Sequence, residues 1–225
     1  MVSSITASVG NVNASERKER KQSIFEGLLC ASAWFFGLSA VGLLLLSNNF
    51  IRLWVGSDYV LDMASVAAIV GAFYVNNMHH ACFVYRNTAG LFVYGKYIPI
   101  VASVLNVGLD VALGLWLGLP GIFLATIISR ALTYEIVDPY IIYKRVFGKS
   151  VTAYYSNYLK YSAVVAISGA ACWAALTVVP VGNWMGFAVG CAIVGVVYSA
   201  VFCLLSFKTS GFGVLHGFVR RIVKR

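Results

Sequence analysis

The amino-acid sequence predicts an all-α polytopic membrane protein with about six transmembrane helices, and three observations carry this prediction. Of its 225 residues, 60% are apolar and only 11% are charged, and the mean hydropathy is +0.82. Soluble domains have roughly 45–50% apolar and about 25% charged residues. Apolar runs of spanning length recur along the chain, and basic residues gather in alternate connections. Together these observations exclude a water-soluble fold.

The apolar runs give the expected helices in chain order. Because about 20 apolar residues cross a bilayer, we expect spans over residues 24–47, 61–84, 97–117, 120–143, 160–181 and 184–207. The first run follows a basic cluster, as in a secretory signal peptide. It is too long for the apolar part of such a peptide, so we expect it to remain in the protein as a span.

The distribution of charge predicts that both termini lie in the cytoplasm. The formal net charge is +9, and 15 of the 17 basic residues fall on one side of the predicted topology: Arg17, Lys18, Arg20, Lys21, Arg86, Lys96, Lys144, Arg145, Lys149, Lys160, Lys208, Arg220, Arg221, Lys224 and Arg225. Arg52 alone lies on the outer side, and Arg130 lies within a span. This is the positive-inside pattern of a membrane protein, and it makes nucleic acid an unexpected partner.

Four parts are expected along the chain. Residues 1–23 are predicted to form a truncated helix end and a basic cytoplasmic loop, and residues 24–143 a group of four helices. Residues 144–207 are predicted to form a linker and a final two-helix hairpin. Residues 208–225 form a basic amphipathic tail, which fits either a helix lying on the anionic inner leaflet or a frayed end that enforces topology.

No enzyme chemistry is predicted. The five cysteines lie within apolar runs and form no C-x-x-C pair, so we expect neither disulfides nor a metal site. Outside the membrane there is no grouping of nucleophile, base and acid. We therefore expect no cofactor, and transport is favoured over catalysis.

The fourth predicted span carries three charged residues, which are costly in hydrocarbon unless they face a cavity or a partner. At helical spacing Arg130, Tyr134 and Asp138 share one face, to which Thr126 belongs, while Glu135 points elsewhere. One interpretation is a polar stripe with Arg130 as an anion contact and an acid as counter-ion or proton carrier. The alternative is a structural ion pair within or between helices.

The third span carries Ser103, Asn106 and Asp110 along one stripe. Asp110 is the only charge of this helix. It could bind a coupling ion, or it could be a fixed partner for Arg130 on the next helix, and the sequence leaves both possibilities open.

The second span contains a polar block of Asn76, Asn77, His79 and His80, followed by Arg86. Adjacent histidines point about 100° apart on a helix, so they lack the i, i+4 geometry of a helical metal site. These side chains could face a cavity, or they could make hydrogen bonds between helices.

Several stretches resemble, in their order and spacing, the C-terminal half of polysaccharide flippases of the multidrug, oligosaccharidyl-lipid and polysaccharide exporter superfamily. The resemblance covers about residues 1–150 and is carried by Val9-Gly10-Asn11, Ile51-Arg52-Leu53-Trp54-Val55-Gly56, Arg86-Asn87-Thr88-Ala89-Gly90-Leu91-Phe92, Gly95-Lys96-Tyr97, Leu105-Asn106 and the stretch from Gly121-Ile122-Phe123 to Ser129-Arg130. Such proteins have two six-helix lobes and move lipid-linked oligosaccharides across the bacterial inner membrane by alternating access. The resemblance implies that this chain is part of one lobe, beginning near the end of its second helix.

The resemblance and the polar residues together give the expected site. The expected substrate-binding residues are Arg130, Arg86, His79, His80, Asn76, Asn106 and Tyr134, and the expected ion-coupling residues are Asp110, Glu135 and Asp138. The implied partners are a lipid-linked sugar, membrane lipids and, in a split transporter, an N-terminal half. Two alternatives are a cation-coupled drug exporter of the same fold and a non-transporting membrane scaffold in glycan assembly.

Overall fold

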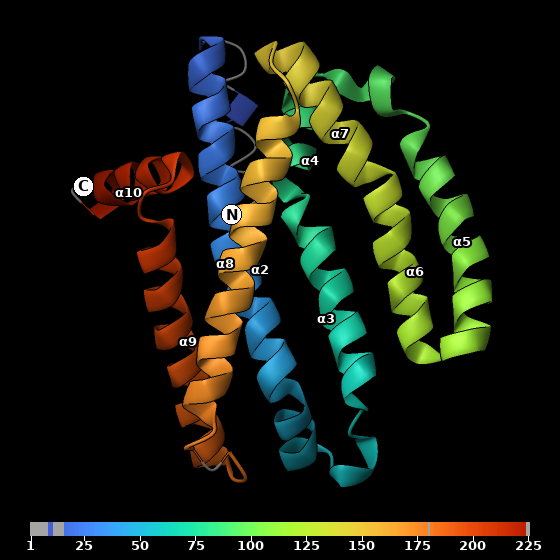
Figure 1. Ribbon diagram of the computed structural model, residues 1–225, viewed down its shortest axis with the longest axis vertical. Helices are drawn as coiled ribbons and strands as arrows, with labels where there is room; N and C mark the ends of the chain where they lie inside the picture. Colours follow the sequence, from blue (N-terminus) through green and yellow to red (C-terminus); the bar gives the residue numbers. More distant parts are fainter. Residues whose placement is uncertain (1–8, 11–15, 180, 224–225) are drawn as a thin grey trace.

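The structure, a computed structural model, describes residues 9–10, 16–179 and 181–223, with side chains as far as residue 217. Every regular element in this part of the chain is helical (Figure 1), which confirms the all-α prediction. The helices are α2 (Lys18–Trp54), α3 (Met63–Met78), α4 (His80–Thr88), α5 (Ile98–Leu117), α6 (Leu119–Leu132), α7 (Tyr134–Ile142), α8 (Thr152–Leu176), α9 (Trp184–Ser206) and α10 (Ser210–Val223). Short 3-10 turns cover Ser57–Tyr59 and Leu91–Gly95, and a π-helical turn covers Tyr143–Phe147.

Five helical segments of the described chain are long and apolar enough to cross a membrane. They are Lys18–Trp54, Leu91–Leu117, Leu119–Phe147, Thr152–Leu176 and Trp184–Ser206. The predicted span over residues 61–84 is not among them, because α3 has 16 residues and α4 has nine, with a break between them at His79. By length and composition the chain is nevertheless a helical membrane protein.

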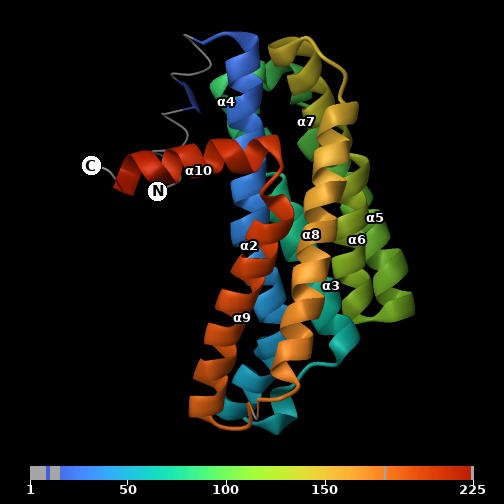
Figure 2. The same cartoon turned by 60° about the vertical axis from the view of Figure 1, so that its left-hand side comes forward.

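Helix α2 is the central element of the bundle. It contacts α8 and α9 on one side and α3 on the other, while α5 lies at the edge and packs mainly on α6 (Figures 1 and 2). With 37 residues at 1.5 Å per residue, α2 is about 55 Å long. The hydrocarbon core of a bilayer is about 30 Å thick, so α2 extends beyond it.

Local sequence sets several helix ends. Asp62 is the N-cap of α3, because its carboxylate accepts the Ser65 backbone N–H at 2.9 Å. The Ser65 hydroxyl donates to the same carboxylate, and the two hydrogen bonds from Ser65 hold the pKa of Asp62 below its ordinary value. Asn183 caps α9 in the same way. The turn between α5 and α6 is made by Gly118, whose φ of +65° suits glycine, and Pro120 stands in the first turn of α6.

Aromatic rings join the helices at the end of the bundle that holds the start of α2. The ring of Phe25 lies 5.1–6.1 Å from those of Tyr85, Tyr143, Phe147 and Tyr154. These side chains come from α2, α4, the π-helical turn and α8, and all five are buried. The cluster therefore fixes α4 and the end of α7 against α2, next to the site described below.

Helix α10 runs across the direction of α2 and α9 (Figures 1 and 2). It crosses α2 at Glu26 and Gly27, where the Ser210 hydroxyl donates to the Glu26 carboxylate and Val214 lies against Gly27. The tail is thus helical through residue 223. The predicted helix end within residues 1–8 lies outside the described residues, as do the tail side chains of Val219, Ile222, Arg220, Arg221, Lys224 and Arg225.

Candidate functional site

A polar cavity of about 460 Å³ lies between the α3–α4 pair, the start of α5 and the α6–α7 pair. It is lined by Asn76, Asn77, His79, His80, Phe83, Arg86, Pro99, Arg130 and Tyr134. Six of the predicted substrate-binding residues are therefore brought to one place. The exception is Asn106.

The cavity lies where two helices are interrupted. The break between α3 and α4 is slight, because His79 keeps a right-handed helical backbone with φ −66° and ψ −12°. The break between α6 and α7 is at Thr133, which has φ −117° and ψ −82°. The Thr133 hydroxyl donates to the Ser129 carbonyl at 2.6 Å, so it satisfies a backbone group near the break. A continuous helix over residues 120–143 was expected, and the break changes which side chains of α7 meet the rest of the bundle.

Pro139 explains a second feature of α7. Proline has no N–H, so the carbonyl four residues earlier, that of Glu135, lacks its helical donor. The Tyr155 hydroxyl of α8 donates to this carbonyl at 3.1 Å. Neighbouring Tyr154 donates to the Glu135 carboxylate at 3.0 Å. Two tyrosine side chains of α8 thus hold Glu135 in place, one at its carboxylate and one at its backbone carbonyl.

A buried ion-pair network forms one wall of the cavity. Asp138 accepts a hydrogen bond from Arg86 Nη1 at 2.9 Å, and its other carboxylate oxygen lies 2.9 Å from His79 Nε2. His79 Nδ1 lies 3.2 Å from Glu135 Oε1. The side chain of Asp138 is fully buried, and that of Arg86 is 13% exposed. The network ties α4 to α7 at the level of the two breaks.

Of the predicted common face, Tyr134 and Asp138 lie one turn apart on α7 and both contact His79. Glu135, which was expected to point elsewhere, contacts the same histidine. The Arg130 guanidinium lies over the Tyr134 ring, 4.8 Å from its centroid. Among the described residues it forms no ion pair, so this cation is left facing the cavity.

Asp110 and Asn106 lie apart from this site. The Asn106 amide lies 3.4 Å from the Asp110 carboxylate and from the Thr126 hydroxyl, and neither residue lines the cavity. The possible pairing of Asp110 with Arg130 does not occur in the described structure. Of the three predicted coupling residues, only Glu135 and Asp138 belong to the network.

The cavity wall presents positive and hydrogen-bonding groups. Arg86 and Arg130 line it with two histidines, two asparagines and Tyr134, whereas the two carboxylates of the network lie behind His79 and Arg86. His79, Glu135 and Asp138 bind one another directly, and no group able to hold a metal ion is found within the described residues. The arrangement suits an anion with hydroxyl groups.

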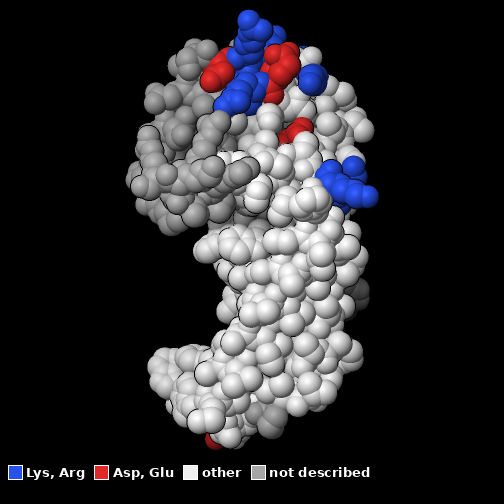
Figure 3. Space-filling model, turned by 90° about the vertical axis from the view of Figure 1, so that its left-hand side faces the viewer, with Lys and Arg blue, Asp and Glu red and all other residues white. Residues whose placement is uncertain are grey.

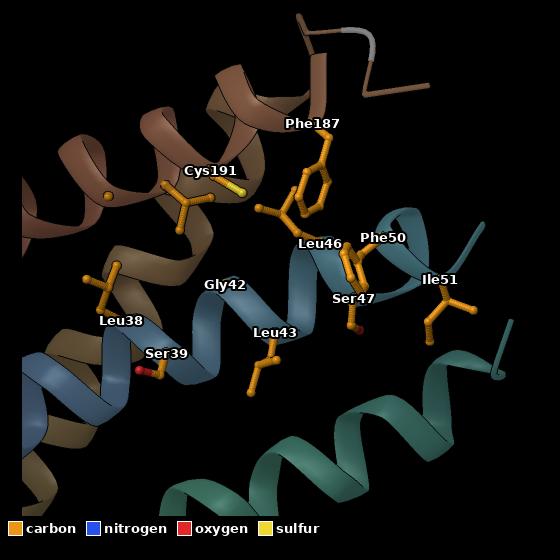
Figure 4. Close-up of a pocket in the computed structure, with 12 residues that line it drawn as sticks. Leu38, Ser39, Gly42, Leu43, Leu46, Ser47, Phe50, Ile51, Phe187 and Cys191 are labelled. Atoms are coloured by element: carbon orange, nitrogen blue, oxygen red, sulfur yellow. The ribbon is translucent and has the colours of Figure 1, made fainter. Parts of the chain in front are cut away.

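Two other cavities of the described structure have a different chemistry. A groove of about 640 Å³ between α2 and α9 is lined almost entirely by apolar side chains such as Leu43, Leu46 and Phe187 (Figure 4). A similar groove of about 670 Å³ lies between α2, α3 and α8. Such walls can contact acyl chains but cannot hold a charged group. Among the described residues on the face seen in Figure 3, most charged side chains lie toward one end, and most of the remaining described surface is uncharged.

Comparison of the chain with protein-family models, with curated proteins and with solved structures gives no match. The fold and the site by themselves define a helical membrane protein with a polar, cation-lined cavity between two interrupted helices.

Proposed function

We propose that the chain belongs to a transporter that binds an anionic, lipid-linked saccharide in the polar cavity and moves it across the bacterial inner membrane. One observation carries the proposal: two interrupted helices meet at a cavity lined by Arg86 and Arg130. Transporters characteristically build substrate sites from interrupted helices near the bilayer midplane. The sequence resemblance to polysaccharide flippases points to the same class.

The depth of the cavity supports this function. An amphipathic helix that crosses the spanning helices lies in the membrane interface, and α10 crosses α2 at Gly27. The 27 residues from there to Trp54 rise about 40 Å, which matches a bilayer with its headgroups. The ring of His80 contacts Phe36 of α2 at 6.2 Å between centroids. Phe36 is nine residues from Gly27, so His80 lies about 14 Å below the interface, close to the midplane. The Arg86 end of the cavity lies nearer the interface, because the hydroxyl of neighbouring Tyr85 donates to the Lys21 carbonyl.

The chemistry of the wall selects an anionic substrate. A guanidinium binds phosphate oxygens through two parallel hydrogen bonds, and the Asn76 and Asn77 amides can bind sugar hydroxyls. An exporter of cationic drugs needs an acid in its cavity, but no Asp or Glu among the described residues lines this one. A scaffold without transport has no need of a cation-lined cavity at this depth.

The proposal is tested by ligand binding to the full chain in lipid nanodiscs, with undecaprenyl pyrophosphate as the probe. A hydrogen bond to a charged group contributes about 1.5–3 kcal/mol, so Arg130→Ala should weaken binding about 10- to 100-fold. Lys149→Ala is the matched control. Lys149 is exposed at the same end of the bundle, outside the cavity, and contacts Gln22, so its loss should leave affinity unchanged.

Two results would overturn the proposal. Equal affinity of the wild-type chain and the Arg130→Ala variant would show that the pyrophosphate binds elsewhere. Binding of a cationic dye such as ethidium that depends on Glu135 or Asp138 would favour the drug exporter.

A further inference from the structure

Both ring nitrogens of His79 lie against carboxylate oxygens of α7. Nε2 is 2.9 Å from Asp138 Oδ2, and Nδ1 is 3.2 Å from Glu135 Oε1. Nδ1 and Oε1 lie within ion-pair distance without hydrogen-bond geometry, and neither atom has a hydrogen-bond partner among the described residues. A neutral imidazole has one N–H donor and one lone pair, and an ionised carboxylate is only an acceptor. A neutral His79 would therefore set a lone pair against a carboxylate.

One additional proton removes this conflict. On the imidazole, it makes both ring nitrogens donors, one toward each carboxylate. On a carboxyl group, it supplies a donor to the second ring nitrogen. Both arrangements hold the same number of protons, so the bound proton belongs to the three groups together.

The burial of the three side chains also favours the bound proton. The His79 side chain is 5% exposed, that of Asp138 is fully buried and that of Glu135 is 11% exposed. With the proton, the charges of these three groups and of Arg86 sum to zero. Without it the network keeps an uncompensated negative charge, which is costly where water is scarce.

We propose that His79, Glu135 and Asp138 together bind one proton at neutral pH, and that this proton sets the affinity of the adjacent cavity for an anion. His79 itself lines the cavity, so the proton exchanges with water there. The second half of the proposal rests on the proposed function of the cavity, whereas the first half does not.

Charge counting gives the direction of the effect. When the network is protonated and neutral, Arg130 leaves the cavity with one net positive charge. When the proton is lost, the negative network balances Arg130, and an anion is no longer attracted. Because coupling between two ligands is reciprocal, anion binding takes up a proton. Affinity should fall about tenfold per pH unit above the pH at which the proton dissociates.

Other polar and titratable groups face this network and are part of its balance. From α4 they are Arg86, His80 and Cys82, from α6 Arg130, from α7 Tyr134, and from α8 Tyr154, Tyr155 and Tyr158. His80 is the other imidazole at the cavity. Above about pH 7 an ordinary imidazole is mostly neutral, so the predicted dependence is measured in that range.

The first measurement is sulfate affinity against pH, using the full chain in nanodiscs. Sulfate keeps its charge over the range used. Glu135→Gln imitates the protonated carboxyl and retains an acceptor for Tyr154, so this variant should keep high affinity at all pH values and lose the dependence. Asp110→Asn, whose acid lies outside the cavity, should keep the wild-type dependence. A wild-type pH dependence that survives in Glu135→Gln overturns the coupling.

The second measurement needs no anion. In ¹⁵N-histidine-labelled chain, the ring nitrogens of His79 report whether the imidazole is charged, and infrared difference spectra report a protonated carboxyl. The expected result at pH 7 is either a charged His79 imidazole or a protonated carboxyl group. The His79→Gln variant assigns the ¹⁵N resonances of His79. A neutral ring beside two ionised carboxylates overturns the proton site. A proton in place without sulfate binding at any pH supports the proton site and contradicts the function proposed for the cavity.

Discussion

Asp138 is the residue whose removal should cost the most stability, because its carboxylate contacts both Arg86 and His79 from a fully buried position. Its two oxygens lie 2.9 Å from Arg86 and 2.9 Å from His79. Removing one partner of a buried ion pair costs about 3–5 kcal/mol, because the other charge remains buried and uncompensated. In Asp138→Asn an amide oxygen still accepts from one of the two partners, so we expect the lower value, about 3 kcal/mol.

The assay is thermal unfolding of the full chain in detergent. For a chain of this length 1 kcal/mol shifts Tm by about 2–4 °C, so Asp138→Asn should lower Tm by about 6–12 °C. Asp110→Asn is the matched control. Asp110 is half-buried on α5 and contacts the Asn106 amide at 3.4 Å, so its loss should change stability by less than about 0.5 kcal/mol.

The reasoning fails if Asp138→Asn melts within 1 °C of the wild-type chain, since the carboxylate would then contribute little to holding Arg86 and His79. It also fails if Asp110→Asn lowers Tm as much as Asp138→Asn, because the loss of any acidic side chain would then have the same effect. A combined Arg86→Gln and Asp138→Asn variant should lose less than the sum of the single changes, because the two side chains share one interaction.

Three further predictions concern packing, pH and topology. Gly121→Ala should destabilise the α5–α6 hairpin, because an added Cβ would overlap the α5 backbone, whereas Gly108→Ala meets nothing within 4 Å and should be tolerated; thermal unfolding compares them. The pKa of Asp62 is lowered in the folded chain, so its ionised carboxylate fully stabilises the start of α3 at pH values above the unfolded pKa near 3.8. This stabilisation disappears as the pH falls through the lowered pKa, and faster amide exchange in the first turn of α3 should report its loss. In a chain with its five cysteines replaced, an impermeant maleimide should label Asp58→Cys on intact cells but leave Lys149→Cys unlabelled, and the reverse pattern would contradict the predicted orientation.

The helical class and most helix positions follow from the sequence, because hydrophobic length is a local property. Runs of about 20 apolar residues predict spans without knowledge of their neighbours. The polar block at Asn76–His80 and the charges from Arg130 to Asp138 also stand out in sequence, since ionisable groups are rare in hydrocarbon. Six of the nine residues that line the cavity come from these two stretches, and Phe83, Arg86 and Pro99 complete it.

The geometry inside the site could not be obtained in this way. Neither His79 nor Thr133 is a usual helix breaker, so the sequence gives no reason to interrupt the helices at these residues. Pro139 is visible in sequence and predicts an unpaired carbonyl at Glu135. That the donor is Tyr155, on a helix 20 residues away, depends on which faces of α7 and α8 meet. Pairing within the network is likewise a tertiary property.

The two arginines of the site have different partners. Arg130 and Asp138 are eight residues apart, about 12 Å along a helix, which is too far to pair. Asp138 instead contacts Arg86 and His79 through its two oxygens. Arg86 is thereby neutralised in the wall, while Arg130 keeps its charge over the Tyr134 ring. Within the described part of the chain Arg130 has no carboxylate partner, which supports the proposal that the cavity binds a ligand with phosphate or carboxylate groups.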